Sequence, residues 1–135
     1  MSGTETLHSP GTVYLVGAGP GDPELLTLRA MRAMQSADVI LFDERVSTAT
    51  LDFARREAKK LLVGKAGDDV TELMIGLAKA SRRVVRLSGA DVVDNTDDVL
   101  AGCRKAGIAI EVVPGVTSAG LKETPQAGSA QVRVA

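Results

Sequence analysis

The amino-acid sequence predicts an α/β fold, with a five-stranded, mainly parallel sheet flanked by helices. Short β-branched runs alternate along the chain with longer stretches of helical periodicity, which is the order expected of βαβ units. The chain has 135 residues, of which 44% are hydrophobic and 24% charged, and these values are ordinary for one globular domain.

The first two elements are predicted from their own local signals. The run VYLV predicts a strand at residues 12–17, which ends in glycines. A helix is expected over residues 23–37, because Asp22 can cap it and Pro23 suits its first position.

The later elements continue the same alternation. Apolar runs predict strands, and apolar residues at helical spacing predict the helices between them. In chain order, we expect a strand at 38–42, a helix at 48–60, a strand at 61–64, a helix at 70–80, a strand at 83–87, a helix at 96–106 and a strand at 109–113.

The two ends of the chain differ from this core in composition. Residues 1–11 are expected to form a flexible leader and residues 120–135 a tail, because both are rich in small and polar residues. Residues 12–119 make up the predicted domain.

Charge and composition exclude several classes of function. Lys and Arg number 16 against 17 Asp and Glu, which argues against a nucleic-acid-binding protein. No apolar run reaches the roughly 18 residues that a membrane span needs, and no secretion signal is present, so a cytoplasmic location is expected. One cysteine and one histidine leave no basis for an internal disulfide or a metal site.

The residues that could carry chemistry are expected at one edge of the sheet. In open parallel sheets, ligands bind beyond the carboxyl ends of the strands. We call the segments that leave those ends the carboxyl edge. They are residues 17–23, 43–47, 64–69, 88–95 and 114–119.

The first of these segments carries alternating glycines at Gly17, Gly19 and Gly21. Their spacing differs from the G-x-G-x-x-G of dinucleotide-binding proteins, and no G-K-[ST] follows. The wider stretch VYLVGAGPGDPELLT resembles the opening of the tetrapyrrole methylases, especially those that methylate uroporphyrinogen III in sirohaem and cobalamin synthesis. The resemblance continues in order through ADVILFDERVS, LLVGK, RRVVRLSGAD and AGIAIEVVPGVTSA.

The resemblance implies a function and a set of site residues. The function is methyl transfer from S-adenosylmethionine to C2 and C7 of uroporphyrinogen III, with S-adenosylhomocysteine as product. By position, the resemblance implies that Asp43 accepts a proton and that Lys65 donates one, while no metal takes part. The residues that it implies at the cofactor are Gly19, Pro20, Gly89, Ala90, Asp91, Thr117 and Ser118.

Three features depart from the family's pattern. Ala90 and Val92 stand where the family has Gly and Pro, and the segment after Lys65 is shorter. The family's second α/β domain is expected to be absent, which would leave the cleft half built. We therefore expect a homodimer or association with another methylase chain.

Alternatives to an active methyltransferase remain open at this point. The chain could be a truncated relative without activity, or a non-catalytic half-domain that binds a partner or an enzyme of the pathway. A nucleotide-binding Rossmann protein is a further alternative, in which Asp43 would contact a ribose. Arg82, Arg83 and Arg86 are interpreted as flanks of the strand at 83–87, and Cys103 as a core residue.

Overall fold

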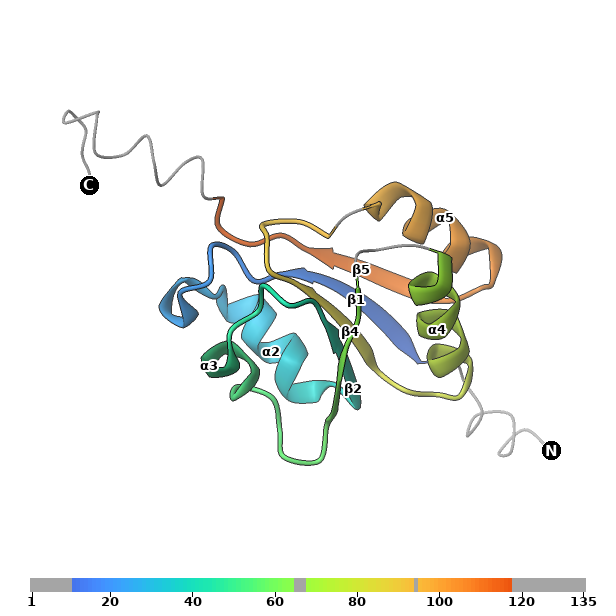
Figure 1. Ribbon diagram of the computed structural model, residues 1–135. Helices are drawn as coiled ribbons and strands as arrows, with labels where there is room; N and C mark the ends of the chain where they lie inside the picture. Colours follow the sequence, from blue (N-terminus) through green and yellow to red (C-terminus); the bar gives the residue numbers. More distant parts are fainter. Residues whose placement is uncertain (1–10, 65–67, 94, 118–135) are drawn as a thin grey trace.

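The structure is a computed structural model that describes residues 11–64, 68–93 and 95–117. Within them, five strands form one sheet in the order β3-β2-β4-β1-β5, and every pairing is parallel (Figure 1). The predicted fold class is therefore confirmed. The strands are β1 (Thr12–Gly17), β2 (Val39–Phe42), β3 (Lys59–Leu62), β4 (Val84–Ser88) and β5 (Ala109–Val113).

Helices cover both faces of the sheet (Figure 1). On one face lie α2 (Leu28–Ser36) and the short α3 (Thr48–Leu51). On the other lie α4 (Asp68–Lys79) and α5 (Thr96–Lys105). The predicted tail, and the predicted leader apart from Gly11, fall outside the described residues.

Alternate residues of β1, β2 and β4 enter two separate apolar layers, because successive side chains of a strand point to opposite faces. Val13 and Leu15 of β1 pack in the layer that includes Met74 of α4 and Cys103 of α5. The next residue, Val16, packs in the layer of α2. Cys103 is fully buried, so its interpretation as a core residue is confirmed.

The predicted helix at 23–37 is divided in two. Asp22 and Pro23 begin a 3₁₀ turn, η1 (Pro23–Leu25), in which the Asp22 side chain accepts a hydrogen bond from the amide of Glu24. A new helix then begins because the Thr27 hydroxyl accepts a hydrogen bond from the amide of Ala30 at 3.0 Å.

The predicted helix at 48–60 is wrong beyond its first turn, since only Thr48–Leu51 is helical. Arg55 is held instead at the start of β2, where its Nε donates to the carbonyl of Ala37 and its guanidinium pairs with Asp38. Lys59 then pairs in the sheet with Val39, so β3 begins two residues earlier than predicted. A helix through this segment would break both sets of contacts.

The two outer strands of the sheet have different surfaces. On β3, the side chains of Lys59 and Lys60 are exposed. On β5, the charged residue Glu111 forms an ion pair with Arg29 of α2.

The end of β1 approaches the segment after β4 more closely than a side chain would permit. A Cβ on Gly17 would lie 2.0 Å from the carbonyl oxygen of Asp91, which is backbone and cannot rotate away. Glycine at this position therefore allows β1 and the segment after β4 to pack together.

We expect Gly17→Ala to lower the free energy of unfolding by about 2 kcal/mol, since overpacking at a rigid site forces the backbone apart. The matched control is Gly76→Ala in α4, where an added Cβ meets no atom within 4 Å. That change should raise stability by about 1 kcal/mol through helix propensity alone. Urea denaturation measures both variants. A Gly17→Ala variant with the same midpoint as the unmodified protein would contradict the close approach.

Candidate functional site

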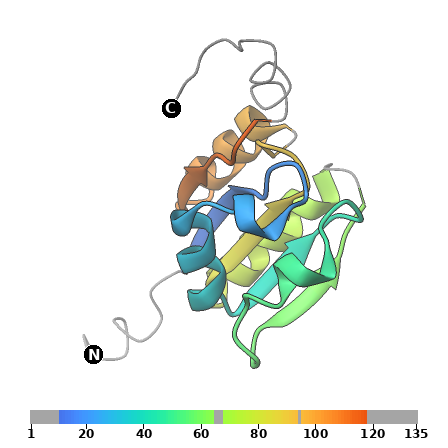
Figure 2. The same ribbon diagram turned by 90° about the vertical axis from the view of Figure 1, so that its left-hand side faces the viewer.

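The carboxyl ends of the parallel strands meet at one side of the molecule, as predicted. Figure 2 looks onto this side, where the blue loop that follows β1 lies beside the orange-red segment that follows β5. The described part of the carboxyl edge contains most of the residues that the sequence nominates. Lys65 and Ser118, two further nominated residues, lie outside the described residues.

Backbone hydrogen bonds join three segments of this edge. After β1, the amide of Gly19 donates to the carbonyl of Ala90 at 3.0 Å. After β5, the amide of Gly115 donates to the carbonyl of Asp91 at 2.8 Å. The loop at residues 88–91 is thus held on both sides. The structure brings together four of the predicted cofactor residues, Gly19, Gly89, Ala90 and Asp91.

The segment that carries Thr117 lies against the glycine loop that follows β1. A Cβ on Gly19 would be 3.2 Å from the carbonyl oxygen of Val116, the residue before Thr117. Gly19 also has a φ of +81°, in the left-handed region that favours glycine. Pro20 and Thr117 are exposed at this edge, where a ligand can reach them.

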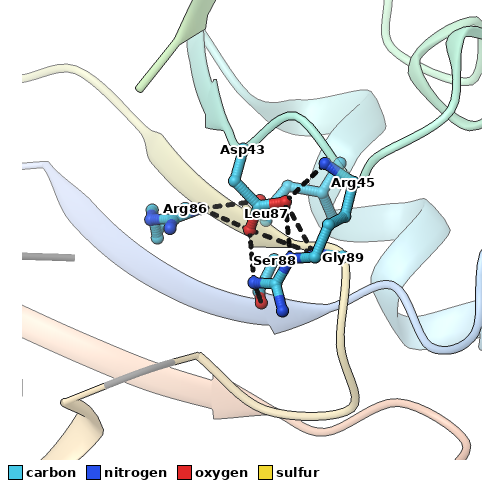
Figure 3. Close-up of polar contacts among 6 residues, drawn as sticks. All are labelled: Asp43, Arg45, Arg86, Leu87, Ser88 and Gly89. Carbon is cyan, nitrogen blue, oxygen red and sulfur yellow. Dashed lines mark hydrogen bonds and ion pairs between the residues drawn. The ribbon is translucent and has the colours of Figure 1, made fainter. Parts of the chain in front are cut away.

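The Asp43 carboxylate, directly after β2, is buried and surrounded by donors (Figure 3). The amide of Gly89 lies 3.2 Å from Oδ2 and 3.3 Å from Oδ1. Arg45 donates its own amide to Oδ1 at 3.0 Å and its guanidinium to Oδ2 at 2.9 Å. Both carboxylate oxygens therefore accept hydrogen bonds within the fold.

Arg86 lies next to this carboxylate, in the middle of β4. Its side chain is 1% exposed, so its interpretation as a strand flank is wrong. Nη1 donates to the carbonyl of Leu87 at 2.7 Å and lies 3.6 Å from Oδ2 of Asp43 (Figure 3). A charged side chain in the centre of a sheet is rare unless it is paired.

A signal for Arg86 exists in the sequence. It interrupts an apolar run, and in the sheet it pairs with Leu41, two residues before Asp43. Residues two apart on a strand share a face. Asp43 and Arg86 therefore reach the same side of the sheet, and their opposite charges could have been matched once the strand order was known.

Opposing effects act on the pKa of Asp43. Burial raises the pKa of this carboxyl. Hydrogen bonds from the Arg45 side chain and the Gly89 amide lower the pKa, and the backbone amide and the charge of Arg45 lower it by smaller amounts. The net pKa lies below the ordinary value of 3.8, so Asp43 is ionised at neutral pH. For Cys103, burial raises the thiol pKa above 9.0, which leaves it protonated.

A hollow of about 500 Å³ lies beside the carboxyl edge. It lies between the start of α5 and the end of β5, with Val92 and Val112 in its wall. These two side chains are 48% and 37% exposed, so apolar surface is open to solvent here.

Metal sites and membrane helices were searched for in the described ranges. There, no cluster of three or more His, Cys, Asp or Glu side chains could hold a metal ion. In the same ranges, no helix combines the length and the apolar character needed to cross a membrane.

Comparison with known proteins adds to this geometry. The family model of tetrapyrrole (corrin/porphyrin) methylases matches residues 12–121. A siroheme synthase of Psychrobacter sp. (strain PRwf-1) is 49% identical over 121 residues, and one of Chromobacterium violaceum is 48% identical over 118. These matches cover 83% and 81% of this chain but 25% of each relative.

A solved structure matches as well. The uroporphyrin-III C-methyltransferase of Thermus thermophilus, complexed with S-adenosylhomocysteine, is 43% identical with a TM-score of 0.75. The match covers 85% of this chain and 52% of that one. The chain thus spans about a quarter of the length of the curated relatives and about half that of the solved structure.

We expect Asp43→Asn to lower the free energy of unfolding at pH 7 by about 3 kcal/mol, because it removes the counter-charge of the buried Arg86. The exposed Asp52→Asn is the control and should stay within about 0.5 kcal/mol. Urea denaturation at pH 7 measures both variants. An Asp43→Asn variant as stable as the parent would contradict the pairing.

The same variant should also change the acid sensitivity of the fold. The folded-state pKa of Asp43 is lowered, so its contribution to stability is complete above the unfolded pKa of about 3.9. That contribution is lost as the pH falls through the lower folded-state pKa. As the pH falls below about 4, the parent should therefore lose stability more steeply than Asp43→Asn. Parallel stability curves for the two proteins would count against the lowered pKa.

Proposed function

Because the chain belongs to the tetrapyrrole methylase family, we propose that it binds S-adenosylmethionine at its carboxyl edge and takes part in methyl transfer to uroporphyrinogen III. The observation that carries this proposal is the joining of three segments at that edge. Gly19 bonds to Ala90, and Gly115 bonds to Asp91, in a fold that matches a methyltransferase complexed with S-adenosylhomocysteine.

The described residues would serve the cofactor in a limited number of ways. S-adenosylmethionine supplies an electrophilic methyl group when it is bound. The glycine loop after β1 lets a ligand lie close to the backbone, since Gly17 and Gly19 present no side chain. Asp91 and Thr117 offer a carboxylate and a hydroxyl beside that loop, suited to the polar groups of the cofactor.

The proton-acceptor role implied for Asp43 stays a prediction, and its contacts favour a different role. A general base works best with a pKa near the working pH and an accessible lone pair. Asp43 has a lowered pKa, and both of its oxygens accept hydrogen bonds inside the fold. We therefore propose that Asp43 positions the loop at 88–91.

We also propose that this chain associates with a second methylase chain at this site, either another copy of itself or a different methylase. The exposed residues Val92 and Val112 beside the hollow support this, because exposed apolar surface next to a binding site favours association. Sedimentation should then show a dimer or a complex. A cytoplasmic location is part of the proposal and agrees with the single, buried Cys103.

A second candidate function is a non-catalytic binding module. It is favoured by the contacts of Asp43, since both oxygens of the predicted proton acceptor already accept hydrogen bonds within the fold. The two candidates differ in turnover. Binding of S-adenosylhomocysteine without methylation of uroporphyrinogen III, even when a complete methylase is added, would favour the binding module.

We expect S-adenosylhomocysteine to bind the unmodified chain in a calorimeter, and Thr117→Val to weaken that binding by about 3- to 10-fold. This corresponds to one lost hydrogen bond of about 0.5–1.5 kcal/mol. Thr48→Val, the same change at an exposed position of α3, should leave the affinity unchanged.

NADH serves as the control ligand, because a dinucleotide-binding protein would prefer it. Heat with NADH and none with S-adenosylhomocysteine at millimolar concentration would overturn the proposed function. Equal affinity of the Thr117→Val variant and the parent would remove Thr117 from the cofactor site.

A further inference from the structure

We propose that Arg86 is a positioning residue, which acts through Asp43 to hold the loop at 88–91 in the conformation that forms the cofactor edge. The inference rests on the proposed function only for what the loop binds. The contacts that hold the loop are properties of the fold itself.

The first step is the burial of Arg86. It lies on β4, between β1 and β2, and its side chain is 1% exposed. A guanidinium cannot shed its charge, so its burial requires a nearby anion. Among the ion pairs of the described residues, Arg86 is paired with Asp43, at 3.6 Å.

The second step is the link from that carboxylate to the loop. Asp43 comes from the end of β2, and it accepts the amide of Gly89, the first residue after β4. One carboxylate therefore connects a buried cation of β4 with the residue where β4 becomes the loop. Without the guanidinium of Arg86, burial of the Asp43 carboxylate would cost more free energy.

The third step is the tightness of packing at Gly89. A Cβ there would lie 2.3 Å from Cβ of Arg45 and 3.0 Å from Oδ1 of Asp43. Arg45 also reaches Ser88, with Nη2 lying 3.3 Å from Oγ. The loop thus lies against Asp43 and Arg45 with no spare room, and a shift of the carboxylate would move the loop.

The fourth step connects the loop to the nominated cofactor residues. On its other side, Ala90 accepts the amide of Gly19, and Asp91 accepts the amide of Gly115. A loop displaced at Gly89 would lose these bonds. Arg86 is buried and so is not accessible to a ligand, but it would influence binding through this chain of contacts.

A direct test uses amide hydrogen exchange followed by NMR. Arg86→Met keeps an unbranched side chain and removes the charge. We expect the amides of Gly89 and Gly19 to exchange at least tenfold faster in this variant, while that of Met34 in α2 keeps its rate. Arg86→Lys, which keeps the charge, should restore part of the protection. Arg82→Met, the same change at an exposed position before β4, should change none of these rates.

A second measurement needs no variant and decides the case if Arg86→Met does not fold. In the unmodified protein, the chemical shift of the Gly89 amide should follow the titration of Asp43, with a midpoint below 3.8. The amide of Met31 in α2, which donates to the backbone carbonyl of Thr27, should not follow it. A Gly89 shift that stays constant through this range would overturn the inference, as would unchanged exchange at Gly89 and Gly19 in a folded Arg86→Met.

The ligand measurement separates this inference from the proposed function. If S-adenosylhomocysteine binds the unmodified chain, Arg86→Met should weaken binding at least tenfold and Arg82→Met should not. Unchanged affinity in a folded Arg86→Met would overturn the positioning role. If the unmodified chain gives no heat with S-adenosylhomocysteine, the proposed function fails, and the amide measurements still decide whether Arg86 holds the loop.

Discussion

The ion pair between Asp43 and Arg86 is the interaction on which the arrangement of the carboxyl edge depends. It joins the end of β2 to the interior of β4, and the same carboxylate accepts the first amide of the loop after β4. A buried pair of this kind contributes little net stability, because both charges lose their hydration. What it contributes here is a defined position for the loop, since a buried charge tolerates few alternative arrangements.

Most of the fold follows from local patterns in the sequence. Both ends of β1 and of β5 lie where the apolar runs predict them. The largest error occurs where distant contacts outweigh local ones. The helix expected over 48–60 ends early because Arg55 binds the start of β2, a contact that helical periodicity cannot indicate. The edge strand β3 begins at Lys59 and Lys60, which do not read as a strand because an outer strand need not be apolar.

The location of the site was predictable from the sequence, but the contacts of Asp43 were not. The rule that ligands bind at the carboxyl ends of parallel strands correctly brought Gly19, Ala90 and Asp91 together. It gave no indication that the carboxylate of Asp43 is occupied by donors from its own fold. It also gave no indication of the buried partner Arg86, whose burial becomes evident only when β2 and β4 are known to be neighbours. Residue type and strand position therefore locate a site, while the roles of its residues depend on strand order.

The unlike outer strands of the sheet limit how copies of this fold can associate. An outer strand offers unpaired amide and carbonyl groups to another chain. On β3, the exposed side chains of Lys59 and Lys60 repel a second copy of the same strand. On β5, Glu111 is neutralised by Arg29, so its charge does not oppose an approaching strand. β5 is therefore the outer strand better suited to pairing, and a two-fold pair through it would use the β5 of both copies. Such an assembly would stop at two copies and would not grow into open-ended fibres.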